Sequence, residues 1–362
     1  MSAIAPFIYT AHAARVVFGA GSIQHLEREI DTLGFKRALV LSTPEQRASA
    51  EMVADLLGAR AAGVFDRAVM HVPIETAREA REIARQLGAD CAVAIGGGST
   101  TGLGKAIALD SGLPIIAIPT TYAGSEMTPV YGITEDGMKK TGKDVRVVPR
   151  CVIYDPELTL GLPVNMSVTS GINAIAHSAE GLYAPDRNPV ISFMAREGIA
   201  ALGRALPAIR LQPTDLAART DAFYGAWLCG IVMGSVGMAL HHKLCHTLGG
   251  TFNLPHAEVH TVILPHAINF NAAAAPAAMQ KISRALGGAP AAQGLYELAR
   301  KNGAPVSLRE LGMKAEDLDT VVRLAVQNPY WNPRAISPDS SAALRDLLQQ
   351  AWEGLSPVSI NN

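Results

Sequence analysis

The segment CAVAIGGGSTTGLGKAIAL, residues 91–109, runs from an apolar stretch through a glycine-rich turn into a second apolar stretch. A short run with Val93 and Ile95, followed by three glycines and Ser99, predicts a strand that feeds a helix. Glycine has no Cβ, so backbone N–H groups there can approach a pyrophosphate, and the dipole of the following helix favours its negative charge. The segment predicts a nucleotide-phosphate site, with glycine needed for packing alone as the alternative.

The surrounding sequence repeats this strand-then-helix pattern. Between residue 37 and residue 155, stretches with helical periodicity such as ETAREAREIARQLG separate five runs typical of strands: RALVLS, AGVFDRA, CAVAIGGG, PIIAIPTT and CVIYDP. Such alternation is typical of a parallel sheet covered by helices on both faces. The first part of the chain is therefore predicted to be a Rossmann-like α/β domain.

The second half reads differently, because strand signals stop after Pro163. Amphipathic helical segments follow one another, among them residues 188–210, 275–287, 290–302 and 341–353. Proline and glycine punctuate DPELTLGLP at 155–163, where a boundary is expected. A chain of 362 residues suits two domains. We predict an α/β domain over 1–160, an all-α helical domain over 161–362, and a cleft between two lobes.

Composition restricts the partners. Hydrophobic residues make up 49% of the chain, charged residues 17%, and the net charge is −1, so no basic field for nucleic acid is expected. Four cysteines lie without CxxC spacing and the opening MSAIAPFIYT does not resemble a signal peptide, which predicts a reduced cytoplasmic protein. The uncharged stretch 222–240 has the length of a membrane span, but four glycines interrupt it and favour a buried helix.

A second polar turn, IPTTYAGSEMTP at 118–129, also follows a predicted strand. Its hydroxyls, on Thr120, Thr121 and Ser125, can bond ribose or phosphate, or can cap a helix. Two such turns at neighbouring strand ends favour nucleotide binding. The earlier GAGSIQ at 19–24 ends in Gln24 where a dinucleotide fingerprint has glycine, so we predict a variant of the nucleotide fold.

Six of the ten histidines lie in HHKLCHTLGGTFNLPHAEVHTVILPH, residues 241–266. His242 and His246 are four residues apart, as are Asn173 and His177, so on helices each pair shares one face. With His256, placed just after a turn, these side chains are expected to converge from two helices and a loop. A buried histidine in a core is usually only a satisfied polar group, but this clustering favours a functional site.

A divalent metal is the first ligand to consider. His177, His242 and His256 with an aspartate at 173 would form a plausible ligand set, yet residue 173 is asparagine, a neutral and poor donor. The site is therefore predicted to work without a metal. His241, His260 and His266 are expected to be structural or supporting.

Four motifs carry a resemblance over nearly the whole chain: GGGSTTGLGKAIAL, IPTTYAGSEMTPVYGIT, SGINAIAHSAEGLYAP and LHHKLCHTLGGTFNLPHAEVHTVILPH, together with NPYWNPR at 328–334. The chain resembles the group III, iron-containing alcohol dehydrogenases, whose helical domain is dehydroquinate synthase-like, and within them the maleylacetate reductases. The resemblance implies a Rossmann-like and a helical domain, NADH or NADPH as cofactor, and commonly a homodimer.

The resemblance also assigns residues. Those implied to bind the cofactor are Thr43, Gly97, Gly98, Ser99, Thr120, Thr121, Ser125 and Lys139. Thr43 falls where many relatives carry an aspartate for the adenosine ribose, and its absence predicts weak discrimination between NADH and NADPH. The implied catalytic residues are His242, His246, Asn173, His177 and His256, with no metal.

The implied reaction is reduction of maleylacetate, a dicarboxylate, and its substituted forms to 3-oxoadipate during degradation of aromatic compounds. Lys243, His241 and Arg334 are candidates for binding the substrate carboxylates. The rival interpretation is a metal-dependent alcohol dehydrogenase acting on a small aldehyde or ketone. A lyase resembling the dehydroquinate synthases, or a nucleotide-binding sensor without turnover, are further alternatives.

Overall fold

The structure is a computed structural model that describes residues 6–11, 15–136 and 138–357, except for the side chains of residues 138 and 139. The chain divides into two compact units. One unit comprises Ala11–Leu162, and the other comprises Met1–Thr10 with Pro163–Asn362.

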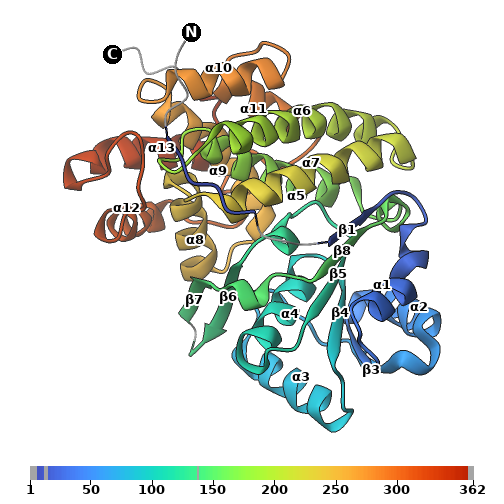
Figure 1. The fold of residues 1–362 in the computed structure, drawn as a ribbon. Helices are drawn as coiled ribbons and strands as arrows, with labels where there is room; N and C mark the ends of the chain where they lie inside the picture. Colours follow the sequence, from blue (N-terminus) through green and yellow to red (C-terminus); the bar gives the residue numbers. More distant parts are fainter. Residues whose placement is uncertain (1–5, 12–14, 137, 358–362) are drawn as a thin grey trace. The chain divides into compact units, whose positions relative to one another are not determined.

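The first unit is built on six parallel strands in the order β1-β8-β5-β4-β2-β3 (Figure 1). The strands are β1 (Arg15–Phe18), β2 (Ala38–Leu41), β3 (Ala61–Phe65), β4 (Cys91–Gly96), β5 (Ile115–Pro119) and β8 (Cys151–Tyr154). The five runs predicted as strands are confirmed. Strand β1 was not predicted, because its four residues are only partly buried and give no apolar run.

Side chains of the inner strands alternate between two cores, which explains why both sheet faces carry helices. Leu39, Ala92 and Ala94 pack with α3 (Ile74–Gln86) and α4 (Gly98–Ser111). Val40, Val93 and Ile95 belong to the other core, with α1 (Leu26–Thr32) and α2 (Arg47–Leu57). The predicted doubly covered parallel sheet is confirmed.

An antiparallel hairpin, β6 (Val130–Glu135) and β7 (Met138–Lys143), was missed by the sequence interpretation. The sequence of β7, MKKTGK, is polar and short, so it lacks the alternation that marks a half-buried strand. The hairpin is joined to β5 by the polar turn predicted to bind nucleotide.

Lys105, on α4, holds this turn in place. Its Nζ donates to the carbonyl oxygens of Ser125 (2.6 Å), Thr128 (2.8 Å) and Val130 (2.8 Å), and to the Thr128 hydroxyl. The side chain is buried, and burial lowers the pKa of the Lys105 ammonium to about 7, while the buried Glu126 raises it. The oxygen ligands compensate an ammonium that has lost its water.

The second unit is helical, as predicted, and no strand occurs after Pro163 in the described part of the chain. Its helices are α5 (Val164–Gly181), α6 (Pro189–Leu211), α7 (Leu216–Ser235), α8 (Leu240–Phe252), α9 (His256–Asn271), α10 (Pro276–Ala285), α11 (Ala291–Lys301), α12 (Leu318–Gln327) and α13 (Ser341–Glu353). One of its cores is formed by the apolar sides of α8, α9, α12 and α13. The four predicted helices correspond to α6, α10, α11 and α13.

Most of the uncharged stretch 222–240 lies in α7, a helix with many buried side chains. Helix α7 ends at Ser235, and the last residue of the stretch, Leu240, begins α8. Among the described helices, none by itself has both the length and the apolar character to cross a membrane. Only α7 and α8 taken together meet that criterion, and they are bent by 96° relative to each other.

We expect the substitution Lys105→Met to destabilise the α/β unit by about 3 kcal/mol, because it removes the donor from several buried oxygen acceptors. This corresponds to a drop of roughly 6–12 °C in thermal midpoint, measured by circular dichroism. Lys36→Met, at an exposed site, is the matched control and should change the midpoint little. An unchanged midpoint in Lys105→Met would show that the lysine does not hold the turn.

Candidate functional site

The sheet order places a topological switch point at the carboxyl ends of β2 and β4. The chain passes from β2 outward to β3, and from β4 it proceeds in the opposite direction to β5, while β2 and β4 are themselves paired. Ligands of open α/β sheets bind at such a switch point. The segments that follow these two strands are the turn with Thr43 and the glycine turn with Gly97 and Gly98.

The glycine turn is shaped for close approach. Gly96 has φ +149°, and a Cβ there would lie 2.5 Å from the Thr100 hydroxyl and 2.7 Å from Gln46 Oε1. Helix α4 begins at Gly98, where a Cβ would meet no described atom within 4 Å. No described side chain caps this helix start, which leaves its first N–H groups for a phosphate.

The second polar turn lies beside the first. Pro119 pairs with Gly96 in the sheet, and the N–H of the next residue, Thr120, donates to the Gly96 carbonyl at 3.0 Å. Gln46 Nε2 donates to the Thr120 hydroxyl at 2.9 Å, and the Thr121 methyl would lie 3.0 Å from a Cβ on Gly97. The structure therefore brings the predicted Gly97, Thr120 and Thr121 together.

The other predicted cofactor residues lie on several different elements of the α/β unit. Thr43 lies at the start of a short 3-10 helix directly after β2, and Ser125 begins the 3-10 helix η4 (Ser125–Met127), held by Lys105. Ser99 lies in the first turn of α4. Lys139 belongs to strand β7, but its side chain lies outside the described residues.

The earlier glycine segment, 19–24, is already occupied by the protein itself. The Asp155 carboxylate accepts from the N–H groups of Gly21 (3.1 Å) and Ile23 (3.0 Å). A phosphate would have to displace this carboxylate, so the segment does not offer a second phosphate site. The sequence favoured the later turn because residue 24 is glutamine rather than glycine, and Asp155 is a separate obstacle at the earlier segment.

In the helical unit, the histidines come together from three helices. Asn173 and His177 lie on α5, His242 and His246 on α8, and His256 is the first residue of α9. The expectation that His256 lies in a loop is therefore wrong, because the turn ends one residue earlier, at Pro255. The rings of His242 and His246 are 6.0 Å apart, and those of His242 and His177 are 5.1 Å apart.

Glu180 is the residue that sequence reasoning missed. Its buried carboxylate accepts from His242 Nδ1 at 2.7 Å and from the backbone N–H groups of Ala239 and His241, each at 2.7 Å. It therefore fixes the start of α8 and orients the His242 ring. The available signal was spacing, because Glu180 lies three residues after His177, on the same face of α5.

The second ring nitrogen of His242, Nε2, contacts another histidine, His177. With Nδ1–H donated to Glu180, His242 Nε2 faces His177 Nδ1 at 2.9 Å. Asn173, one turn before His177, is buried, and its Oδ1 has no hydrogen-bond partner among the described residues. A buried carbonyl oxygen without a partner suits a ligand that supplies a donor.

The His246 side chain faces a different group. Its Nδ1 lies 3.0 Å from the Tyr330 hydroxyl, and the Lys243 ammonium lies 5.8 Å from the centre of the Tyr330 ring. Burial lowers the pKa of Lys243. Arg334, another candidate for a substrate carboxylate, instead places its guanidinium 4.1 Å from the centre of the Phe270 ring.

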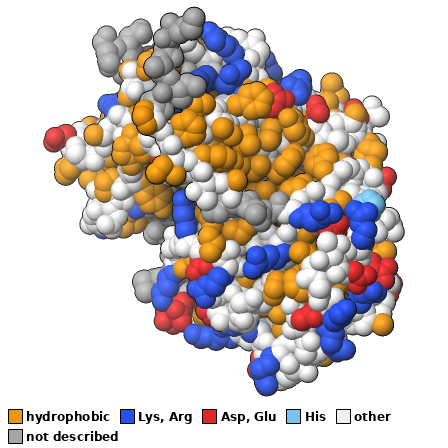
Figure 2. All heavy atoms as spheres, viewed as in Figure 1, with side chains coloured by type: hydrophobic (Ala, Val, Ile, Leu, Met, Phe, Trp, Pro, Cys, Tyr) orange, Lys and Arg blue, Asp and Glu red, His pale blue; other side chains and the backbone are white. Residues whose placement is uncertain are grey.

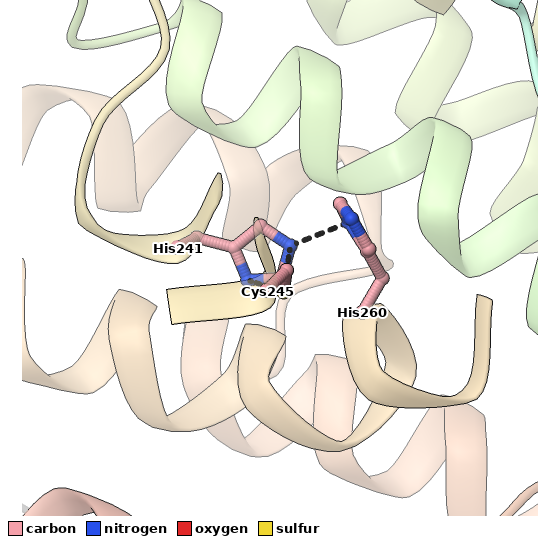
Figure 3. A group of neighbouring side chains, drawn as sticks. All are labelled: His241, Cys245 and His260. Atoms are coloured by element: carbon pink, nitrogen blue, oxygen red, sulfur yellow. Dashed lines mark hydrogen bonds between the residues drawn. The ribbon is translucent and has the colours of Figure 1, made fainter. Parts of the chain in front are cut away.

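The supporting histidines form a second, fully buried group on α8 and α9 (Figure 3). His241 Nε2 lies 2.9 Å from His260 Nδ1, and Cys245 Sγ lies 3.6 Å from the same His241 nitrogen. Burial holds the pKa of His241 and of His260 well below the usual range, so both imidazoles are neutral. Burial also lowers the pKa of His266 to about 4.

Comparison with known proteins assigns this architecture. A model described as iron-containing alcohol dehydrogenase matches residues 13–156, and one described as the C-terminal part of the Fe-containing alcohol dehydrogenase family matches residues 167–351. The chain belongs to the iron-containing alcohol dehydrogenase family.

Within this family, the chain is similar to proteins named maleylacetate reductase. One from Burkholderia cepacia is 65% identical over 351 residues, covering 97% of this chain and 99% of the relative. The crystal structure of maleylacetate reductase from Agrobacterium tumefaciens is 56% identical with a TM-score of 0.93, covering 98% of this chain and all of that one. The crystal structure of maleylacetate reductase from Rhizobium sp. strain MTP-10005 is 55% identical with a TM-score of 0.92, covering 97% of this chain and 99% of that one.

The iron in the family's name implies a metal, and the donors present here fit one poorly. The residues in the implied positions, Asn173, His177, His242 and His256, supply no anion. Two of them, His177 and His242, are hydrogen-bonded to each other. A divalent cation held by neutral donors alone keeps its full charge in a buried environment, which is unfavourable. These four residues therefore fit an iron ion poorly.

We expect Glu180→Gln to lower the stability of the helical unit by about 2–4 kcal/mol, because one amide oxygen cannot accept from all three donors that Glu180 now satisfies. Urea unfolding followed by circular dichroism measures the loss. Glu316→Gln, an exposed site in the same unit, is the matched control. If both variants unfold alike, the Glu180 contacts do not organise α8.

Proposed function

We propose that this chain is an NADH- or NADPH-dependent reductase of maleylacetate, which it converts to 3-oxoadipate. The observation that carries the proposal is the buried hydrogen-bond chain from Glu180 through His242 to His177, next to a neutral Asn173. The similarity of at least 55% to enzymes named maleylacetate reductase supports the choice of substrate. The chemistry of maleylacetate explains why a site of this kind suits that substrate.

Maleylacetate has a carbon–carbon double bond conjugated with a ketone. When bound, a reduced nicotinamide would supply a hydride to the far carbon of this double bond, and negative charge would then develop on the ketone oxygen as an enolate. An enolate is less basic than the alkoxide formed when a simple ketone is reduced. Hydrogen-bond donors can therefore replace the Lewis acid that an alcohol dehydrogenase uses.

In this proposal, His242 and His246 are the donors to the enolate oxygen or to the carbon that finally takes up a proton. Glu180 accepts a hydrogen bond from His242 Nδ1 and so holds this ring in one orientation, as the carboxylate of a catalytic triad does. Asn173, His177 and His256 polarise and shape the pocket. Lys243 is the remaining candidate cation for a substrate carboxylate.

The α/β unit would hold the cofactor. Backbone N–H groups at Gly97, Gly98 and Ser99 face the pyrophosphate, and the hydroxyls of Thr120, Thr121 and Ser125 bond ribose or phosphate, with Lys139 near the nicotinamide ribose. Thr43, which follows β2, has no charge and can lie next to either the 2′-hydroxyl of the adenosine ribose in NADH or the 2′-phosphate in NADPH.

We also propose that the enzyme functions without a resident metal, because an anionic ligand is missing from the implied set. A metal-dependent alcohol dehydrogenase relies on a firmly bound metal as its Lewis acid, so the missing anionic ligand disfavours the rival interpretation.

We propose a homodimer in a reducing cytoplasm. The described cysteines are all free and buried, which suits a reducing compartment. Hydrophobic side chains gather over α6 and α7 on one face (Figure 2), where Val190 and Phe193 are exposed. Exposed apolar patches of this kind mark contacts between subunits.

The decisive experiment follows NADH absorbance with maleylacetate and with simple aldehydes, using protein stripped by a chelator. We expect undiminished oxidation of NADH with maleylacetate alone. Asn173→Asp should gain affinity for Zn²⁺ or Fe²⁺, measured by mass spectrometry of bound metal, because it adds a buried carboxylate that needs a cation.

Two variants test whether turnover depends on this site. His242→Ala should lower kcat by ~10²-fold, the usual effect of losing one donor to a developing oxyanion. His25→Ala, on the exposed surface of the α/β unit, should leave kcat unchanged. Activity that disappears on stripping and returns with iron or zinc would favour the alcohol dehydrogenase instead.

We expect Thr43→Asp to shift cofactor preference toward NADH by roughly tenfold or more, because a carboxylate accepts from the ribose hydroxyls and repels a 2′-phosphate. The ratio of kcat/KM for NADPH to that for NADH measures the shift. Thr43→Asn has a similar size without the charge and serves as control. An unchanged ratio in Thr43→Asp would place the adenosine ribose elsewhere.

A further inference from the structure

The buried group of His241, Cys245 and His260 has a geometry that catalysis does not require. Ligand atoms of these three side chains all lie within 4.8 Å of one another. They come from adjacent turns of α8 and from α9, and point toward one another (Figure 3). None of the three belongs to the metal set implied by the family, which falls on Asn173, His177, His242 and His256.

The distances suit a small ion bound in a plane. His241 Nε2 lies 2.9 Å from His260 Nδ1 and 3.6 Å from Cys245 Sγ. A point equidistant from three atoms so spaced lies about 2 Å from each, which is the length of metal–nitrogen and metal–sulfur bonds to a first-row ion. The ion would replace the hydrogen bond between the two imidazoles.

The surroundings select a monovalent, thiophilic ion. All three side chains are at most 1% exposed, and no fourth His, Cys, Asp or Glu completes the group within the described chain. Zn²⁺ prefers four ligands and would leave a net positive charge in this apolar environment, whereas one thiolate neutralises a monovalent cation. Thiolate and imidazole ligands are those that Cu(I) accepts.

We propose that His241, Cys245 and His260 form a three-coordinate Cu(I) site that links α8 to α9. On binding, the Cys245 S–H bond breaks, an S–Cu bond forms and the proton passes to the buffer, while the two imidazoles bind as neutral ligands. Copper enters as Cu(I), so no electron is transferred.

A partly exposed histidine lies beside the buried group on α9. His256 is only half-buried, and its ring centre lies 4.4 Å from that of His260, four residues later on the same helix face. In this proposal, the ion reaches the buried thiol by way of the His256 imidazole.

The test titrates the purified, reduced, chelator-stripped protein with Cu(I) under anaerobic conditions against a chromogenic Cu(I) chelator. We expect one equivalent to bind per chain, X-ray absorption to show one sulfur among its ligands, and the thermal midpoint to rise by about 5 °C or more. Cys245→Ser and His260→Gln should lose the bound equivalent and the thermal shift. Neither readout depends on turnover, so failure of this proposal is distinct from failure of the proposed reductase activity.

Cys229→Ser is the matched control, because it removes another buried thiol of the helical unit. It should keep the copper equivalent. Retention of copper in Cys245→Ser, a bound copper with nitrogen ligands alone, or binding of Zn²⁺ but not Cu(I) would each overturn the proposal. Apo Cys245→Ser is checked by circular dichroism, and His260→Gln supplies an independent variant if it does not fold.

Discussion

The Glu180 carboxylate is the group on which the candidate catalytic site depends. It is fully buried, and its oxygens accept hydrogen bonds from three N–H donors, which compensate the loss of water. Two of these donors are backbone amides at the start of α8, on Ala239, which precedes the helix, and on His241. The third belongs to His242, so one carboxylate sets both the position of the helix and the orientation of a ring that it carries.

Lys105 has a comparable role in the α/β unit. Its buried ammonium gathers oxygens from a turn and the start of a hairpin, elements that have little apolar surface of their own. The glycine turn and the second polar turn then meet at the carboxyl ends of paired strands. In each unit, one buried polar side chain, Lys105 or Glu180, holds polar segments in place through several hydrogen bonds.

Asn173 gives the site its chemical character. An aspartate at this position would add an anionic ligand to the neighbouring histidines and would favour a bound metal. With asparagine, His177 and His242 bond to each other, and an unpartnered amide oxygen remains for a ligand. A substrate whose reduction passes through a stabilised enolate suits hydrogen bonding by these neutral side chains better than a simple ketone does.

The sequence by itself determined the doubly covered parallel sheet, the helical second half, the glycine turn at Gly97 and Gly98 between a strand and a helix, and the clustering of histidines. Each rests on local patterns, namely apolar periodicity and turn residues, which act over a few neighbouring positions. Tertiary structure alone decided the hairpin β6–β7, whose polar strands carry no pattern, and the occupation of the first glycine segment by Asp155 from the far end of the unit. It likewise decided that Glu180 reaches His242 and that His241, Cys245 and His260 meet, because such contacts join residues that are distant in the chain and depend on how α5, α8 and α9 pack.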